Sequence, residues 1–117
     1  MIVRHPHAHE VEAILALFAQ DVAAGLMLPR SASQIRHHLD RWLVAEQGGQ
    51  VIGCVSLVCY NGSLAEVRSL AVCPDHRNNG IGSQLVTEAV AMARARGLKR
   101  VLTLTRDKVV QFVDKLV

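Results

Sequence analysis

Three apolar, strand-like segments in the middle of the chain constrain the fold most. They span residues 42–47, 51–60 and 64–72, and the dipeptides Gly48-Gly49 and Asn61-Gly62 separate them. Such dipeptides between apolar runs are among the strongest signals of a β-hairpin. The sequence therefore predicts three consecutive antiparallel strands.

Helical patterns flank these strands on both sides. Apolar residues recur at offsets of three, four, seven and eleven from Val11, and Ser31 precedes Gln34 at the spacing of a capping box. Residues 81–96 repeat the helical pattern and end at Gly97. The remaining predictions are a strand at 2–5, a strand at 99–105 and a final helix at 107–116. The expected fold is α/β (α+β), with helices on both faces of a mixed, mostly antiparallel sheet.

Composition limits the class of protein. The 117 residues, half of them apolar, suffice for one domain with one core. No apolar run approaches the roughly 18 residues of a membrane span, and the N-terminus lacks the pattern of a secretory leader, so a cytoplasmic protein is expected. The odd number of cysteines, Cys54, Cys59 and Cys73, fits neither a disulfide framework nor a zinc site.

Charge and histidine content narrow the choice of ligand. The formal net charge of +3 suits an anionic ligand, but scattered basic residues and 3% aromatics do not predict nucleic-acid binding. His5, His7 and His9 alternate near the N-terminus, yet no cysteine or carboxylate cluster completes a metal site. No metal cofactor is therefore predicted.

A glycine-rich segment lies between the third hairpin strand and the helix that follows it. Its residues are Arg77, Asn78, Asn79, Gly80, Ile81, Gly82 and Ser83. Backbone N–H groups at a helix N-terminus have no partner within the helix, and glycine leaves room for an anion to approach them. No lysine follows the last glycine as a Walker loop requires, and Leu85 stands where a dinucleotide fingerprint needs glycine or alanine. The segment predicts a site for a pyrophosphate.

This arrangement resembles the GNAT superfamily of N-acetyltransferases, whose signature Q/R-x-x-G-x-G/A follows the fourth strand. Here the signature runs from Arg77 to Gly82. Residues 65–74 (AEVRSLAVCP), 29–31 and 102–105 are similar to amino-acid N-acetyltransferases of the N-acetylglutamate synthase type. The resemblance implies transfer of the acetyl group of acetyl-CoA to an amine, with the α-amino group of glutamate or a related amino acid as the best candidate.

The resemblance also implies roles for individual residues. Backbone groups of Leu70, Ala71 and Val72 would contact the pantetheine arm and the acetyl carbonyl, while the segment from Arg77 to Ser83 would hold the pyrophosphate. A strand edge splayed from its neighbour offers unpaired N–H groups that stabilise the charge developing on the thioester oxygen.

Three charged residues are candidates for catalysis and acceptor binding. A glutamate at the place of Glu66 is the general base in some superfamily members; the alternatives here are an ion pair with Arg68 or a solvated position. Strict alternation along the strand would put Glu66, Arg68, Leu70 and Val72 on one face. Arg30 and Arg68 are candidates for binding acceptor carboxylates, because guanidinium gives bidentate geometry; the alternative is a surface arginine at either position.

The sequence leaves the rest of the chemistry open. Because no cysteine has an evident activating partner, direct attack of the amine on the thioester is expected. Tyr60 is either a general acid or an ordinary packed strand residue.

Superfamily members usually continue past the last helix into two more strands, and the sequence predicts that these strands are missing here. Val113 stands where many members carry a tyrosine that protonates coenzyme A. The exposed edge of the strand at 99–105 is then expected to form a homodimer. The alternative function is a catalytically degenerate acyl-CoA-binding module.

Overall fold

The computed structural model of the chain describes residues 1–104 and 109–114. Within these residues six strands form one sheet in sequence order: β1 (Ile2–Arg4), β2 (Trp42–Gln47), β3 (Gln50–Cys59), β4 (Leu64–Val72), β5 (Arg100–Leu104) and β6 (Val109–Asp114). Neighbouring strands are antiparallel except β4 and β5, which are parallel. The predicted mixed, mostly antiparallel sheet is confirmed.

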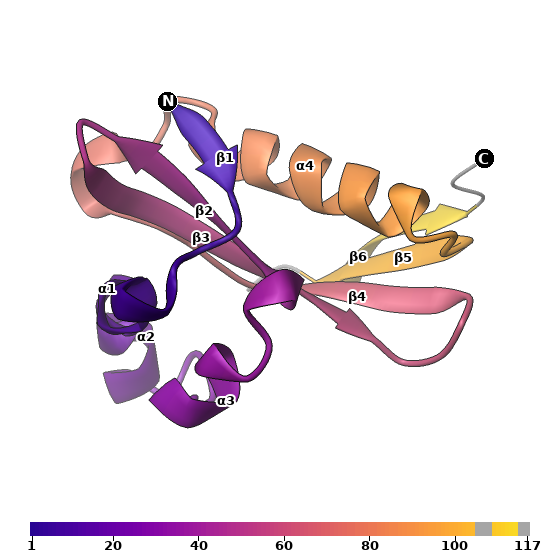
Figure 1. Cartoon of the computed structure of the whole chain (residues 1–117), viewed down its shortest axis with the longest axis horizontal. Helices are drawn as coiled ribbons and strands as arrows, with labels where there is room; N and C mark the ends of the chain where they lie inside the picture. Colours follow the sequence, from indigo (N-terminus) through magenta and orange to yellow (C-terminus); the bar gives the residue numbers. More distant parts are fainter. Residues whose placement is uncertain (105–108, 115–117) are drawn as a thin grey trace.

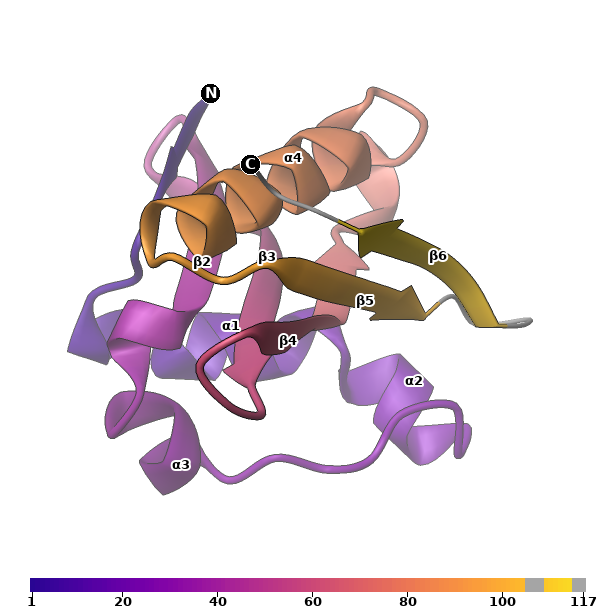
Figure 2. The same ribbon diagram turned by 90° about the vertical axis from the view of Figure 1, so that its right-hand side faces the viewer.

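Helices cover both faces of this sheet, as predicted (Figure 1). They are α1 (Val11–Leu17), α2 (Ala19–Ala23), α3 (Ala32–Arg36) and α4 (Ile81–Ala95). The α4 helix lies on one face, and α1 to α3 lie on the other (Figures 1 and 2). The single helix expected from Val11 is broken at Phe18, whose φ of −116° and ψ of 16° are not helical. No helix in the described ranges is both long and apolar enough to cross a bilayer.

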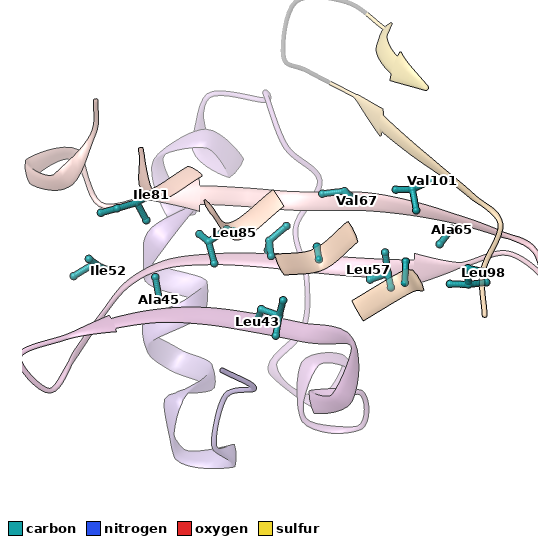
Figure 3. Packing of buried hydrophobic residues seen from close by; sticks show 13 residues of the cluster. Leu43, Ala45, Ile52, Leu57, Ala65, Val67, Ile81, Leu85, Leu98 and Val101 are labelled. Carbon is teal, nitrogen blue, oxygen red and sulfur yellow. The ribbon is translucent and has the colours of Figure 1, made fainter. Parts of the chain in front are cut away.

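Two hydrophobic cores result, one on each side of the sheet. On the α4 side, Ile81, Leu85, Ala89 and Ala93 are buried at a spacing of four residues and pack against the strands (Figure 3). On the other side, Phe18 and Trp42 stack with ring centroids 6.4 Å apart beside Val11, Ile14 and Ile35. Burying a large apolar side chain contributes roughly 1.5–3 kcal/mol, so these layers hold the helices to the sheet.

Both predicted hairpins are present, although their turns differ. Gly48 and Gly49 have φ values of 59° and 80°, the left-handed conformation that a two-residue type I′ turn requires. In the second hairpin the Asn61 side chain accepts hydrogen bonds from the backbone N–H groups of Ser63 and Leu64, at 2.8 and 2.9 Å. The asparagine carboxamide thus holds the turn that its neighbouring glycine was expected to make.

The predicted helix at 107–116 is wrong within the described residues, because Val109–Asp114 is strand β6, antiparallel to β5. Three of its six residues are valines, whose branched side chains lose rotamer freedom in a helix and favour strands. The sheet thus continues by one strand where the last two were expected to be missing. Since β5 is paired on both sides, it is not the open edge from which a homodimer was predicted, and the homodimer stays a prediction without that support.

A β-bulge interrupts β4. Arg68 is paired with Ser56 and Ala71 with Cys54, so two residues of β4 lie opposite one residue of β3. One of the two, Ser69, has a φ of 55°, which non-glycine residues seldom adopt. The extra residue changes which face each later side chain occupies.

The bulge makes the prediction of a single face for Glu66, Arg68, Leu70 and Val72 wrong. Val67 and Val72 pack into the same α4-side core although an odd number of positions separates them. A Cβ atom added to Gly82 of α4 would lie 3.9 Å from both Leu70 and Val72. Leu70 and Val72 therefore face α4, whereas Glu66 and Arg68 face the layer that contains α3.

Arg4 ties β1 to the rest of the fold. Its guanidinium binds both oxygens of Glu10 at 2.8 and 2.9 Å, and it contacts Glu46 of β2 at 3.1 Å. The hydrogen bonds from Arg4, opposed in part by burial, lower the pKa of Glu10 to about 2. A carboxylate with a lowered pKa stabilises the folded chain above its unfolded-state pKa of about 4.3, and this contribution fades as the pH falls toward 2.

We expect Glu10→Gln to lower the free energy of unfolding at pH 7 by about 1–3 kcal/mol, because the charged partner of Arg4 is lost. Urea denaturation at pH 7, 4 and 2.5 measures the effect, and the difference from the parent should shrink as the pH falls. Glu12→Gln is the control: Glu12 also pairs with an arginine, Arg36, but its side chain is 67% exposed, so the loss should be smaller. Equal losses in both variants, or a pH-independent difference, would contradict this account.

Candidate active site

The parallel strands β4 and β5 separate part-way along their length. Their register pairs end at Val67 and Thr103, and β4 continues to Val72. In Figure 2 the end of β4 turns away from β5. Among the described residues, the β4 segment beyond Val67 has no β5 partner. The Val72 carbonyl accepts a hydrogen bond from the Arg77 Nε at 3.3 Å, and the other backbone groups on that edge are available to a ligand.

The glycine-rich loop and the first turn of α4 lie beyond the end of this segment. Asn78 and Gly80 have φ values of 67° and 78°, both left-handed, and Gly80 is the N-cap of α4 without a side-chain cap. The first backbone bond of the helix runs from the Gln84 N–H to the Gly80 carbonyl, at 3.0 Å. The N–H groups of residues 81–83 therefore have no partner within the helix, and the helix dipole favours an anion there.

The splayed strand and the loop line one cavity of about 460 Å³, which we call the cofactor cavity. Its lining residues are Asp21, Leu70, Ala71, Val72, His76, Arg77, Asn78, Gly80, Ile81, Gly82 and Ser83. All the predicted cofactor residues except Asn79 are on this wall. The sequence did not single out Asp21 and His76, since neither belongs to the glycine motif.

A second cavity, of about 220 Å³, lies between α3 and the strands, and we call it the acceptor cavity. Its lining residues are Arg30, Gln34, Ile35, His38, Arg41, Trp42, Ser56, Leu57, Val58 and Arg68. The structure thus brings together the two predicted substrate arginines, from the loop before α3 and from β4. It adds Arg41, which precedes β2 and which no sequence pattern marked.

The three arginines differ in their pairing. Arg68 contacts Glu66 through Nε at 2.8 Å, whereas neither Arg30 nor Arg41 forms an ion pair with a described carboxylate. Two cations that no described carboxylate neutralises therefore line a small cavity. A ligand with carboxylate groups matches this charge, because guanidinium binds carboxylate through two parallel hydrogen bonds.

Glu66 is buried beneath two polar side chains and does not line the acceptor cavity. The residue is 2% exposed, and its Oε1 accepts hydrogen bonds from the Arg68 Nε and from the Tyr60 hydroxyl. Donation to the carboxylate raises the pKa of Tyr60. The ion pair with Arg68, one of the two alternatives to a general base, is present. Tyr60 takes part in polar contacts rather than in plain strand packing.

Cys54 is not an activated nucleophile. Cys54 is fully buried, its thiol donates to the Ser69 carbonyl at 3.6 Å, and burial raises its pKa to about 12. Such a thiol holds its proton at neutral pH and is a poor nucleophile. In residues 1–104 and 109–114, no group of histidine, cysteine, aspartate and glutamate side chains is placed to hold a metal ion.

Comparison with known proteins identifies the family. The model of the acetyltransferase (GNAT) family matches residues 9–115, which is almost the whole chain. The chain belongs to the GNAT acetyltransferase family. The splayed β4 and the glycine-rich start of α4 both lie within the matched residues.

Relatives of known sequence or structure agree with this assignment. An uncharacterized N-acetyltransferase of Chlorobaculum tepidum is 40% identical over 103 residues, which cover 88% of this chain and 66% of that protein. A Mycobacterium tuberculosis protein solved in complex with CoA superimposes with a TM-score of 0.83 at 30% identity, covering 92% of this chain and 66% of the other. N-acetylglutamate synthase from Neisseria gonorrhoeae, complexed with coenzyme A and N-acetyl-glutamate, gives a TM-score of 0.82 at 26% identity.

The match covers only part of each of these proteins. The chain spans 66% of the Chlorobaculum relative and of the Mycobacterium chain, and 24% of the Neisseria synthase, of which it covers one part only. The synthase match itself includes 87% of the present chain.

We expect Gly82→Val to weaken acetyl-CoA binding by about tenfold to a hundredfold, the loss expected when charge-assisted hydrogen bonds to phosphate are displaced. A Cβ at Gly82 meets only ordinary contacts at 3.9 Å, so the fold should tolerate the change while the side chain enters the cofactor cavity. Isothermal calorimetry with acetyl-CoA measures the affinity.

The matched control is Gly62→Val. Gly62 has open space around its Cβ position, and it lines neither cavity. This variant should bind acetyl-CoA like the parent. If folded Gly82→Val also binds with unchanged affinity, the pyrophosphate site lies elsewhere.

Proposed function

We propose that the chain is an acetyl-CoA-dependent N-acetyltransferase whose acceptor is the α-amino group of glutamate or a related acidic amino acid. The observation that carries the proposal is that both cavities reach the same short stretch of β4. Arg68 lines the acceptor cavity and Leu70 lines the cofactor cavity. Two residues of extended chain span at most about 7 Å, so an amine in one cavity lies near a thioester in the other.

The cofactor cavity suits the pyrophosphate, pantetheine and acetyl parts of acetyl-CoA. The free N–H groups at the start of α4 suit the pyrophosphate, and the unpaired edge of β4 suits the pantetheine arm and the acetyl carbonyl. CoA complexes of the structural relatives support this assignment.

The acceptor cavity supports a substrate with two carboxylates. Arg30 and Arg41 offer one guanidinium for each carboxylate of glutamate, and Arg68 adds a third that Glu66 already neutralises. The likeness to a synthase complexed with N-acetyl-glutamate supports the same acceptor class. Its identity of 26% leaves the choice among acidic amino acids to experiment.

The reaction we propose is direct. The neutral amine attacks the acetyl carbonyl carbon, the C–S bond breaks, and coenzyme A leaves as a thiolate that takes up a proton from solvent. The proton lost by the amine passes to Glu66 through water, since the buried carboxylate is not on the wall of the acceptor cavity. In the tetrahedral intermediate that precedes C–S cleavage, backbone N–H groups of the splayed β4 edge stabilise the negative charge on the former carbonyl oxygen.

Release of free thiol from acetyl-CoA in the presence of glutamate tests the function, with a panel of neutral and basic amino acids for comparison. Glutamate-dependent release supports the proposal. Tight binding of acetyl-CoA without thiol release for any amine would favour a catalytically degenerate acyl-CoA-binding module instead.

Arg30→Gln should raise the KM for glutamate by about tenfold to a hundredfold, because a charged hydrogen-bond donor to a carboxylate is lost. The KM for acetyl-CoA should not change, since Arg30 lines only the acceptor cavity. Arg36→Gln is the control, because Arg36 pairs with Glu12 and lines neither cavity. An effect of equal size in both variants would argue against a role for Arg30 in acceptor binding.

Removing the three cysteines should leave the chemistry intact. We expect the combined variant Cys54→Ala, Cys59→Ala and Cys73→Ala to keep a kcat within about twofold of the parent, because the amine attacks the thioester directly. Steady-state kinetics measure kcat, and a thermal scan shows separately whether the change at the buried Cys54 lowers stability. Isolation of an acetylated cysteine that glutamate discharges would overturn the direct mechanism.

A further inference from the structure

Tyr60, Glu66 and Arg68 form a closed ring of hydrogen bonds beside the acceptor cavity. The Tyr60 hydroxyl donates to the Glu66 Oε1, the Arg68 Nε donates to the same oxygen at 2.8 Å, and the Arg68 Nη2 donates to the Tyr60 hydroxyl at 2.8 Å. The Arg68 guanidinium carbon also lies 5.9 Å from the centre of the tyrosine ring. The tyrosine therefore contacts the arginine both through its hydroxyl and through its ring.

The register of the β3–β4 hairpin brings these residues together. Val58 is paired with Glu66 and Ser56 with Arg68, so Glu66 and Arg68 lie on the face that carries the even-numbered residues of β3. Tyr60 follows the end of β3 and continues this alternation, diagonal to Glu66. All three residues precede the bulge at Ser69, so the reversal of faces does not separate them.

The ring leaves one edge of the guanidinium unoccupied. Of the five N–H groups of an arginine, the Nε–H and one Nη2–H are used by Glu66 and Tyr60. The two Nη1–H groups and the second Nη2–H remain, and the side chain is 41% exposed on the wall of the acceptor cavity. A guanidinium held by two acceptors on one side can bind a carboxylate with its other edge without first being ordered.

The residues of the ring differ in burial, so changing each of them would affect the fold to a different extent. Glu66 is 2% exposed, so removing its partner Arg68 would leave a buried charge unpaired and endanger the fold. Tyr60 is 49% exposed, so removing only its hydroxyl leaves most packing contacts and the Glu66–Arg68 ion pair in place. The hydroxyl affects the orientation of Arg68 more than the stability of the chain.

We infer that Tyr60 is a positioning residue that holds Arg68 against Glu66 so that the free guanidinium edge binds a carboxylate of the acceptor. The inference rests on the proposed function for its substrate. The ring of hydrogen bonds and its position beside the acceptor cavity are observed in the structure and do not depend on the proposed function.

The kinetic test is Tyr60→Phe, which removes the hydroxyl alone. We expect the KM for glutamate to rise about threefold to tenfold, the loss expected for one hydrogen bond that no longer orients a charged group, with kcat and the KM for acetyl-CoA unchanged. In an Arg68→Lys background the same change should have no further effect, because lysine has no fork to orient. A fall in kcat alone, or an equal effect in both backgrounds, would overturn the inference.

A second test does not require activity. The Nη2–H signal of Arg68, whose proton is donated to the Tyr60 hydroxyl, should be sharp and slow to exchange with solvent in a ¹⁵N NMR spectrum of the parent, and broadened or lost in Tyr60→Phe. Thermal unfolding should show that this variant is folded. An unchanged Arg68 signal in Tyr60→Phe would overturn the positioning role even if glutamate is acetylated. Loss of the signal in a protein that acetylates no amino acid would instead retain the positioning role and reject the proposed function.

Discussion

The bulge in β4 is the constraint on which both cavities depend. One residue, Ser69, adopts a left-handed conformation with a φ of 55°, and this moves Leu70 and Val72 to the α4 face while Glu66 and Arg68 keep the α3 face. The strand also parts from β5 after Val67. A regular strand would have placed all four side chains on one face, and its edge would have been consumed by pairing with β5.

The separation of faces divides the chemistry into two parts. One side of β4 meets the glycine-rich start of α4, where backbone N–H groups, the helix dipole and the Arg77 guanidinium favour an anion. The other side meets α3, where guanidinium groups supply the charge. In the proposed reaction the two substrates would meet only along the few residues of β4 from Arg68 to Leu70, and a small movement there would affect both cavities together.

Local patterns predicted the elements well where a short-range signal was strong. The hairpins at residues 42–72, the capping box at Ser31 and the helix that begins at Ile81 all formed as expected. The predicted helix at 107–116 failed because the β-branched residues of Val109–Asp114 favour a strand, and this segment pairs with β5. The bulge was missed because strict alternation was assumed, and no residue type in that strand marks a left-handed serine.

The sequence by itself determined the family and the glycine-rich turn at the start of α4, because the glycine motif is contiguous and its conformation depends on residues close to it. It also named Arg30 and Arg68, yet it could not bring them to one wall or add Arg41, since these residues come from three separate elements. Only the tertiary structure decided that Glu66 is buried under Tyr60 and Arg68. The reason is that side-chain pairing across strands depends on register and on the bulge, and both are set by packing between segments far apart in the chain.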